Sequence, residues 1–537
     1  MQAMSSGRIK QQGAASTAEP GRPRPAVLRF AMSEPATRAA WRRARSLGYC
    51  EHVPRARALT RICFDTPAQA LAHAGIVLRL EKQGKQWVQS VARRRPEYER
   101  TRIDSSIPVP EPSVALEHIV DEMLRDDIVR ETRGQPLEPQ YEAQLKRATG
   151  TLHADDGVTI EMTVETGRIA ANGHAVPWHQ AELELIEGEP VTLFRVAKAL
   201  FPTDGLDLSR YSGDGTEPML AALAAGETPT VPRKAEPVEL PASADVDSAA
   251  RRILRECQQQ IARNIVVIQE TTDIEGPHQL RIGLRRLRSA LSVFKSAFPD
   301  AEIRRLRAEA QWLGAEVGRL RDLDAVMADV VCPEAEQFPD EPGFPDLIGS
   351  LEAAAAAGRT QLRKTLRTER VQAFGLDLIQ LVETRDPTVG TDSDASPPAE
   401  MAIRRCANRA LRKRWQKVLA RGEEIEALTL EQRHALRKEL KKIRYMVEFF
   451  EPLYPHGRVA PFLKRLKKLQ TVFGALNDAR VTQRVLDQRR PQAADEPAAV
   501  ERAAGCVIGA TRTRAMFDWR KARKHWARLG RAKPFWR

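Results

Sequence analysis

The second half of this 537-residue chain contains an internal duplication, which limits the folds it can adopt more than any other feature. The segment HQLRIGLRRLR (278–288) aligns with HALRKELKKIR (434–444) at an offset of 156 residues. The same offset aligns LGAEVGRLRDLDAV (313–326) with LQTVFGALNDARVT (469–482), so that Asp322 matches Asp478. Because one register holds across two separate motifs, we predict two related units that face each other.

Apolar residues recur at helical spacing through this half, and strand patterns are almost absent, so we predict an all-α domain built from two similar halves. At 100° per residue, the first motif places one histidine and three cations within about 80° on one helix face. These residues are His278, Arg281, Arg285 and Arg288, and the second motif repeats the stripe with His434, Arg437, Lys441 and Arg444. Each stripe is about 15 Å long, given the rise per residue of an α-helix.

Such a stripe is usually a solvated helix face whose cations pair with glutamates one turn away. Here the first motif contains no carboxylate, and the second contains only Glu439. Because like charges one turn apart repel each other, we predict that the two stripes line a basic groove that binds a polyanion. The two histidines could instead brace the fold, and Asp322 and Asp478 could be helix caps or partners that orient the cations.

Composition narrows the class of protein. The chain has 85 Lys and Arg against 71 Asp and Glu, a formal charge of +14, and 42% of its residues are hydrophobic. This favours several folded domains and a polyanionic partner. We find no run of about 18 apolar residues, no signal peptide, and no CxxC pair among the six cysteines. We therefore expect a cytoplasmic protein in a reducing compartment, with no membrane segment, disulfide framework or structural zinc site.

The chain divides into segments that differ in composition and in hydrophobic pattern. Residues 1–26 are predicted to be a disordered arm, and residues 227–246 a Pro- and Ala-rich linker. Between them, 27–226 is expected to be an α+β domain with an antiparallel sheet that closes into a barrel or tunnel. Its expected strands are 27–32, 58–66, 76–94, 157–176 and 181–186, with turns at Gly84 and Asn172-Gly173 and helices near 34–47 and 191–200.

Residues 247–537 form the helical domain, interrupted by an expected flexible loop at 386–400. The last segment, 502–537, reads as a basic tail, with 11 Lys and Arg against Asp518. Aromatic residues lie among these charges: Trp519, Trp526, Phe535 and Trp536. Such a segment could bind nucleic acid by stacking bases. Because no helix-turn-helix, zinc-finger or RNA-binding signature accompanies it, we expect only non-specific binding of nucleic acid.

The duplicated motifs HxxRxxxRRLRS with RLRDLD, and HxLRKxxKKIRY with GxLNDA, resemble the CHAD domain, the conserved histidine α-helical domain, over about residues 245–530. The resemblance implies a helical bundle of two similar halves that binds inorganic polyphosphate, on granules among other places. It implicates His278, Arg281, Arg285, Arg286, Arg288, His434, Arg437, Lys438, Lys441, Lys442 and Arg444. Point cations and guanidinium forks suit a linear chain of phosphates.

The first half resembles a CYTH domain, the fold of thiamine triphosphatases, inorganic triphosphatases and class IV adenylate cyclases. The matching segments are 63–90 and 164–188, and fusion to a CHAD domain is a familiar order in bacterial proteins. The resemblance implies an antiparallel β-tunnel in which basic residues hold a triphosphate and acidic residues hold Mg²⁺ or Mn²⁺.

The chain departs from the CYTH pattern at several positions. The ExExK signature of the first strand is replaced by residues 28–32, Glu81 and Ala92 stand where basic residues are usual, and 210–218 replaces a Ser-Lys-rich segment. The surviving phosphate-binding candidates are Arg79 and either Lys146 or Arg147. The metal-ligand candidates are Glu161, Glu182 and Glu184, and Glu165 is a further surviving acid.

We therefore expect a degenerate tunnel and a non-enzymatic polyphosphate-binding protein that requires no cofactor. The alternative is a metal-dependent triphosphatase, a hydrolase that uses Mg²⁺ or Mn²⁺ in the CYTH-like domain and receives substrate from the helical domain. Metal-dependent release of phosphate from tripolyphosphate would separate the two.

Overall fold

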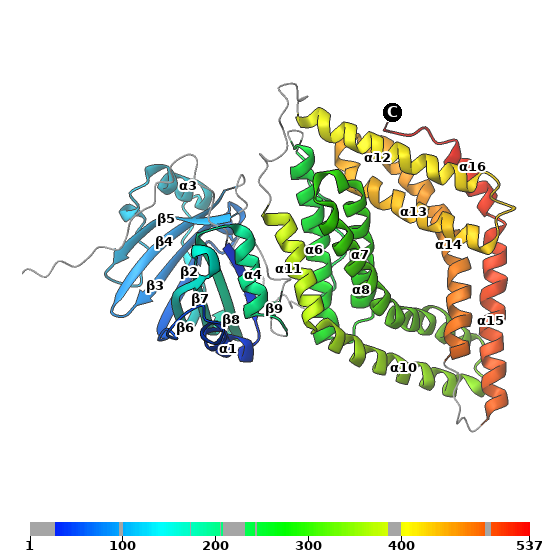
Figure 1. Ribbon diagram of the computed structural model, residues 1–537, viewed down its shortest axis with the longest axis horizontal. Coiled ribbons are helices and arrows are strands. Elements are labelled where there is room, and N and C mark those ends of the chain that lie inside the picture. The colour runs from blue at the N-terminus through cyan, green and yellow to red at the C-terminus, as the bar shows by residue number, and fades with distance from the viewer. Residues whose placement is uncertain are drawn as a thin grey trace, which may run out of the picture.

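The structure is a computed structural model that describes residues 27–95, 100–171, 173–203, 206–207, 231–241, 244–384, 399–488 and 496–536. It confirms the predicted order of an antiparallel β domain followed by a helical domain (Figure 1). The predicted arm at 1–26, the segment 210–218 and the predicted loop from 386 to 398 lie outside the described residues, as does Asn172 of the expected turn.

The first domain is one sheet of nine strands in the order β5-β4-β3-β2-β6-β7-β8-β1-β9, with every pair antiparallel. Its strands are β1 (Val27–Met32), β2 (Arg57–Asp65), β3 (Ile76–Gln83), β4 (Gln86–Arg95), β5 (Arg100–Val109), β6 (Glu138–Ala154), β7 (Val158–Ala171), β8 (His174–Glu187) and β9 (Leu206–Asp207). Gly84 joins β3 to β4 with φ of +68°, a conformation that favours glycine, so the predicted turn is confirmed.

Within the described part of the sheet domain, four α-helices cover one face of the sheet. Helices α1 (Glu34–Ser46) and α4 (Pro190–Leu200) pack on β1 and β6 to β8, while α2 (Ala70–His73) and α3 (Glu122–Thr132) pack on β3 and β4. Along β7, Ile160, Met162 and Val164 point into this helix-covered core, because side chains alternate along a strand. Glu161, Thr163 and Glu165 therefore face the other side, which we call the inner face.

The helical domain contains two series of helices in the same order, as the duplication predicts. The first series is α6 (Val246–Glu270), α7 (Glu275–Val293), α8 (Asp300–Val326), α9 (Cys332–Gln337), α10 (Gly343–Leu366) and α11 (Glu369–Glu383). The second is α12 (Ala399–Gly422), α13 (Leu430–Phe450), α14 (His456–Gln488), α15 (Pro497–Trp519) and α16 (Ala522–Gly530). The duplicated motifs thus lie on α7 and α8 in one copy and on α13 and α14 in the other.

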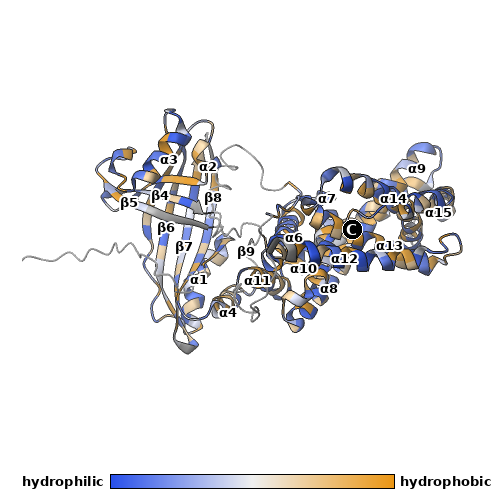
Figure 2. Ribbon diagram, turned by 90° about the horizontal axis from the view of Figure 1, so that it is seen from above, coloured by the Kyte–Doolittle hydropathy of each residue, from blue (hydrophilic) through white to orange (hydrophobic). Residues whose placement is uncertain are grey.

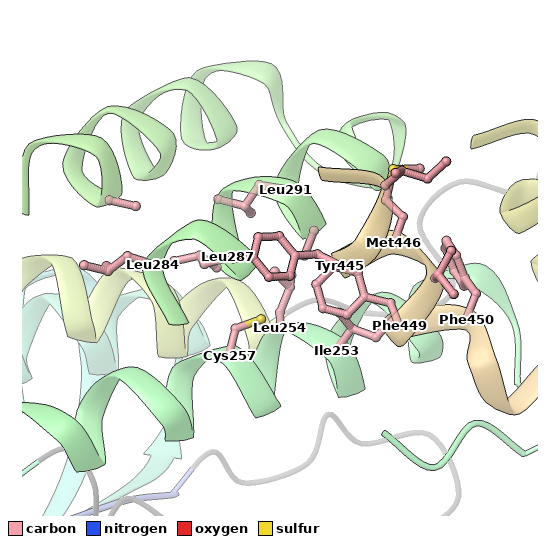
Figure 3. Close-up of a cluster of buried hydrophobic side chains, with 14 of the residues drawn as sticks. Ile253, Leu254, Cys257, Leu284, Leu287, Leu291, Tyr445, Met446, Phe449 and Phe450 are labelled. Carbon is pink, nitrogen blue, oxygen red and sulfur yellow. The ribbon is translucent and has the colours of Figure 1, made fainter. Parts of the chain in front are cut away.

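The apolar faces of α7 and α13 meet in the core of this domain. Figure 3 shows Leu287 of α7 beside Tyr445 of α13, and Leu284, Cys257 of α6 and Phe449 of α13 belong to the same buried cluster. Burying one face of each helix fixes its rotation, so the basic stripe on each is held on a defined side. A capping box at Thr429 and Gln432 starts α13 just before its stripe.

The two domains share an interface between α4 and α11, which lie side by side in both views (Figures 1 and 2). Leu376 and Ile379 of α11 are fully buried in the core of the sheet domain. Asp377, between them, accepts from Lys198 of α4 and from Arg305 of α8. The sheet domain is therefore packed against the helical domain rather than joined to it only by a linker.

Three expectations differ from the structure. Val238 and Leu240 lie within the predicted linker, yet they are buried in the helical core. Strands β5 and β6 and helix α3 were missed; the sequence of β6, EPQYEAQLKRATGTLHA, is rich in residues that favour helices. The predicted basic tail is α15, α16 and a folded end, in which Phe535 and Trp536 are 7% and 2% exposed. Its last aromatic residues are core residues and cannot stack on bases.

Candidate functional site

The two basic stripes converge at the contact between α7 and α13. Arg281 and Arg285 of α7 lie close enough to Arg437 and Lys441 of α13 for repulsion among them to add to burial in lowering the pKa values of Arg285, Arg437 and Lys441. We call these four side chains the central basic cluster. The prediction that the two copies face each other with their cations is therefore consistent with the geometry of the described residues.

The local electrostatics of the cluster disfavour positive charge. Burial, followed by repulsion from Arg285, Arg437, Arg444 and Arg281, lowers the pKa of Lys441 to about 6. Burial and the neighbouring Arg281 likewise lower the pKa of Arg285 to about 10. Partial removal of water weakens the hydration of these cations, and little negative charge replaces it. The arrangement is therefore strained electrostatically until an anion approaches.

Two carboxylates lie beside the cluster at matching positions of the repeat. Arg281 donates to Asp322 of α8 at 2.6 Å, and Arg484 of α14 donates to the other oxygen of the same carboxylate at 2.6 Å. Asp322 thus links the two halves. Its counterpart Asp478 of α14 has a pKa that burial raises, in part offset by Arg437. The structure supports the expectation that these acids orient the cations.

The two repeated histidines differ in their contacts. His278 accepts a hydrogen bond from Arg321 through Nδ1 at 2.9 Å, so its neutral ring carries the proton on Nε2. Burial and then Arg321 lower the pKa of His278. Burial and then Lys438 lower the pKa of His434. Both rings are therefore poised to gain a proton when an anion binds.

Some of the predicted site residues lie elsewhere. Arg286 is 2% exposed, donates to Gln260 at 2.9 Å, and lies 3.6 Å from Glu256, so it belongs to the core beneath the stripe. On α13, Lys442 pairs with Glu439 at 2.8 Å. Arg286 and Lys442 occupy matching positions of the repeat, and neither faces the central basic cluster.

The outer ends of the stripes make local contacts. Arg288 donates to Gln311 of α8 at 2.8 Å. At the same position of the second copy, Arg444 donates to Gln470 of α14 at 3.1 Å and pairs with Glu448. Lys438 is exposed at the rim. We place these three cations at the edge of the site.

The sequence argument missed three further cations around the cluster. Arg321, Arg480 and Arg484 approach it from α8 and α14, and each contacts or lowers the pKa of a predicted site residue. Arg321 stands directly before Asp322 in the repeated motif, which is the one signal that pointed to it. Arg480 and Arg484 have no basic counterpart in the first copy, since Asp324 and Ala328 occupy those positions.

On the inner face of the sheet, the predicted phosphate-binding arginines are neutralised by buried carboxylates. Glu81 pairs with Arg61 at 2.7 Å, with Arg147 at 3.3 Å and with Arg79 at 3.8 Å. Glu165 accepts from Arg147 at 2.8 Å and from Arg61 at 3.1 Å. Lys146 is exposed on the opposite face of β6, so Arg147 is the candidate that faces inward.

Both carboxylates of this network stay ionised. Burial raises the pKa of Glu81, but Arg61, Arg79 and Arg147 outweigh that effect and lower it to about 2. The pKa of Glu165 is also about 2, because Arg61 and Arg147 outweigh its burial. The five side chains of the network therefore carry a net charge of only about +1. An apolar cluster that includes Tyr141 and Trp178 fills the same face next to it.

The predicted metal ligands lie on this inner face as well. Glu161 and Glu184 are directly opposite each other on β7 and β8. Glu182 pairs with Arg29 of β1 at 2.5 Å, so a guanidinium already neutralises this carboxylate. This donor set does not fit a divalent cation. Across the described ranges, no group of three or more His, Cys, Asp and Glu side chains could hold a metal ion.

Comparisons with known proteins bear on the helical domain as a whole. Residues 252–487 match the family model of the CHAD domain. No curated protein matches the chain. In addition, no helix in the described part of the chain is long and apolar enough to cross a membrane.

Three solved structures illustrate the likeness. The CHAD domain from the plant Ricinus communis is 28% identical, with 56% of this chain and 98% of that chain covered and a TM-score of 0.47. PptA from Streptomyces chartreusis is 17% identical, and the match covers 53% of this chain and 100% of that chain with a TM-score of 0.40. A Hippeastrum protein, described as an adenylyl cyclase with a dominant triphosphatase activity, is 15% identical, covering 38% and 96%, with a TM-score of 0.25. The residues that match the CHAD family model, 252–487, contain both basic stripes, and the resemblance predicted for the helical domain is therefore confirmed.

Proposed function

We propose that this protein binds inorganic polyphosphate through the central basic cluster. The observation that carries the proposal is that Arg281 and Arg285 of one half lie near Arg437 and Lys441 of the other, where burial and the neighbouring cations lower the pKa values of Arg285, Arg437 and Lys441. A linear polyanion running between α7 and α13 would pair with both rows and relieve their repulsion. Association with polyphosphate granules would follow from this binding.

The cluster suits phosphate chains because of its side-chain types. Its three arginines offer planar forks of donors that match phosphate oxygens in pairs, and Lys441 offers a point charge. The histidines add donors that become charged as the anion arrives.

The test is binding of long-chain polyphosphate to the full-length chain at about 150 mM salt, where surface attractions are screened. Reversing Arg281, Arg285, Arg437 and Lys441 to Glu should abolish binding. The matched control reverses four exposed arginines of the sheet domain, Arg42, Arg45, Arg55 and Arg168, and so changes the net charge equally. Binding that survived in the first variant, or that was lost equally in the control, would refute the assignment.

The same samples test the alternative function. Phosphate release from tripolyphosphate with Mg²⁺ or Mn²⁺ should be absent, because Arg79 and Arg147 are neutralised and Glu182 is paired with Arg29. Metal-dependent release that disappeared in Glu182→Ala would instead support a triphosphatase in the sheet domain, with the metal role assigned to Glu161, Glu182 and Glu184.

A further inference from the structure

A second cationic surface lies between α14 and α16, away from the duplicated motifs. A groove of about 500 Å³ is lined by Lys464, Arg465 and Lys468 of α14, by His525, Arg528 and Arg531 of α16 and its end, and by Pro461. We call it the C-terminal basic groove. It falls partly beyond the residues that match the family model, which ends at 487.

The cations of this groove differ from their neighbours on the same helices. Next to it, Lys521 pairs with Asp518 at 2.7 Å and Arg523 with Glu426 at 3.5 Å. Within the described residues, no carboxylate forms a salt bridge with the five lysines and arginines of the groove. Five unneutralised cations around one hollow repel each other, which favours an anionic occupant.

The groove is aligned with the central basic cluster along α14. Lys464 precedes Asp478 by 14 residues, which corresponds to about 21 Å along the helix and about 40° around it. Asp478 itself lies beside Arg437 of the cluster. Lys468 and Arg465 lie about 80° and 140° around the helix from Asp478, so a flexible strand bound in the cluster can reach the groove by turning part of the way around α14.

The lining also discriminates between classes of polyanion. Proteins that hold single-stranded nucleic acid combine cations with aromatic side chains on which bases stack. Here the lining contains no aromatic side chain except the imidazole of His525. The nearby Trp526 packs against Gly422 and the helical core. The lining that the described residues form therefore suits phosphate groups and offers no platform on which a base could stack.

We propose that the C-terminal basic groove is a second binding segment for the same inorganic polyphosphate strand, so that long chains engage both sites and short ones only the central basic cluster. This inference rests on the proposed function. Joining two sites through one ligand raises the apparent affinity by 10²- to 10⁴-fold, about the range for linked binding events. The protein should therefore select long polyphosphate over tripolyphosphate by more than charge alone predicts.

The test compares affinity for tripolyphosphate and for long-chain polyphosphate in the full-length protein. The groove variant, Lys464→Glu, Lys468→Glu and Arg528→Glu, should keep its affinity for tripolyphosphate and lose at least about tenfold for the long chain. The slope of log affinity against log salt should become shallower by about two, because each of the three lost phosphate contacts contributes about 0.7 to that slope. The control reverses Arg42, Arg45 and Arg55.

A second variant guards against misfolding: the same three residues replaced by Gln, with helical content and unfolding midpoint checked by circular dichroism, should show the same selective loss. Unchanged long-chain affinity in folded groove variants would overturn this inference and leave the proposed function intact. Absence of long-chain binding in the unaltered protein would overturn both. Loss of duplex DNA binding with polyphosphate binding retained would make the groove a nucleic-acid site and also overturn the inference.

Discussion

The pKa of Lys441 predicts that polyphosphate binding takes up a proton. In the free protein this pKa falls from 10.5 to about 6, first through burial and then through Arg285, Arg437, Arg444 and Arg281, so that at pH 7 the amine is mostly neutral. An anion in the central basic cluster restores the charge and raises the pKa. One proton is then bound with each strand, and affinity should fall by up to about tenfold per pH unit between pH 7 and pH 8.

Isothermal titration calorimetry in buffers of different ionisation enthalpy measures this proton. Lys441→Met should take up about one proton fewer than the unaltered protein, whereas protons gained by His278, His434 or the terminal phosphates are common to both and cancel. The control is Lys442→Met, on the same helix but paired with Glu439. Equal proton uptake in all three proteins would refute the reasoning, because Lys441 would then either be charged already or lie away from the ligand.

The same lysine affects stability. The pKa of Lys441 is lower in the folded protein than in the unfolded chain, so burying its charge lowers the free energy of unfolding. This loss of stability is present in full below about pH 6 and disappears as the pH rises towards 10.5. At pH 7, Lys441→Met should therefore raise the unfolding midpoint, and the pH dependence of stability between 6 and 10.5 should become flatter. Lys442→Met should not have this effect.

Two further predictions concern the sheet domain. Glu165→Gln leaves Arg61 buried with one carboxylate fewer and should lower the free energy of unfolding, measured with denaturant, by about 3–5 kcal/mol. Glu161 is exposed on the same strand, so Glu161→Gln should change this free energy by less than about 0.5 kcal/mol. Similar losses of stability in the two variants would refute the network. Asp377→Asn weakens the contacts to Lys198 and Arg305 at the domain interface and should speed hydrogen exchange in α4 and α11. The control, Asp346→Asn on α10, should leave this exchange unchanged. Unchanged exchange in Asp377→Asn would show that the apolar contacts alone hold the interface.

The stripes were predictable because both of their determinants are local. Helical periodicity fixes which side chains share a face, and the repeat identifies two helices of the same kind. The same geometry separates Arg286 from the stripe, since it lies about 80° from His278 in the direction away from Arg281. Arg286 and Lys442 entered the candidate set through the CHAD resemblance, and the structure places both outside the cluster.

The network on the inner face could not be predicted, because its partners are distant in sequence. Arg61 contacts Glu81 and Glu165, which are 20 and 104 residues away, and only the strand pairing brings them together. Arg147 lies on the unrecognised strand β6, so the register of that side chain could not be predicted from the sequence. Glu81 was noticed as a departure from the CYTH pattern, but its role as a counter-ion required the pairing.

The two halves of the chain treat a similar set of cations in opposite ways, and this supports placing the ligand in the helical domain. In the sheet, Glu81 and Glu165 pair with the arginines that a triphosphate would need, so a ligand would have to displace ion pairs that are already buried and short. Breaking such pairs costs several kcal/mol. In the helical domain, Asp322 leaves most of the cluster unpaired, and Lys441 is held largely neutral. A polyanion gains energy there by filling a site that the folded protein leaves electrostatically incomplete.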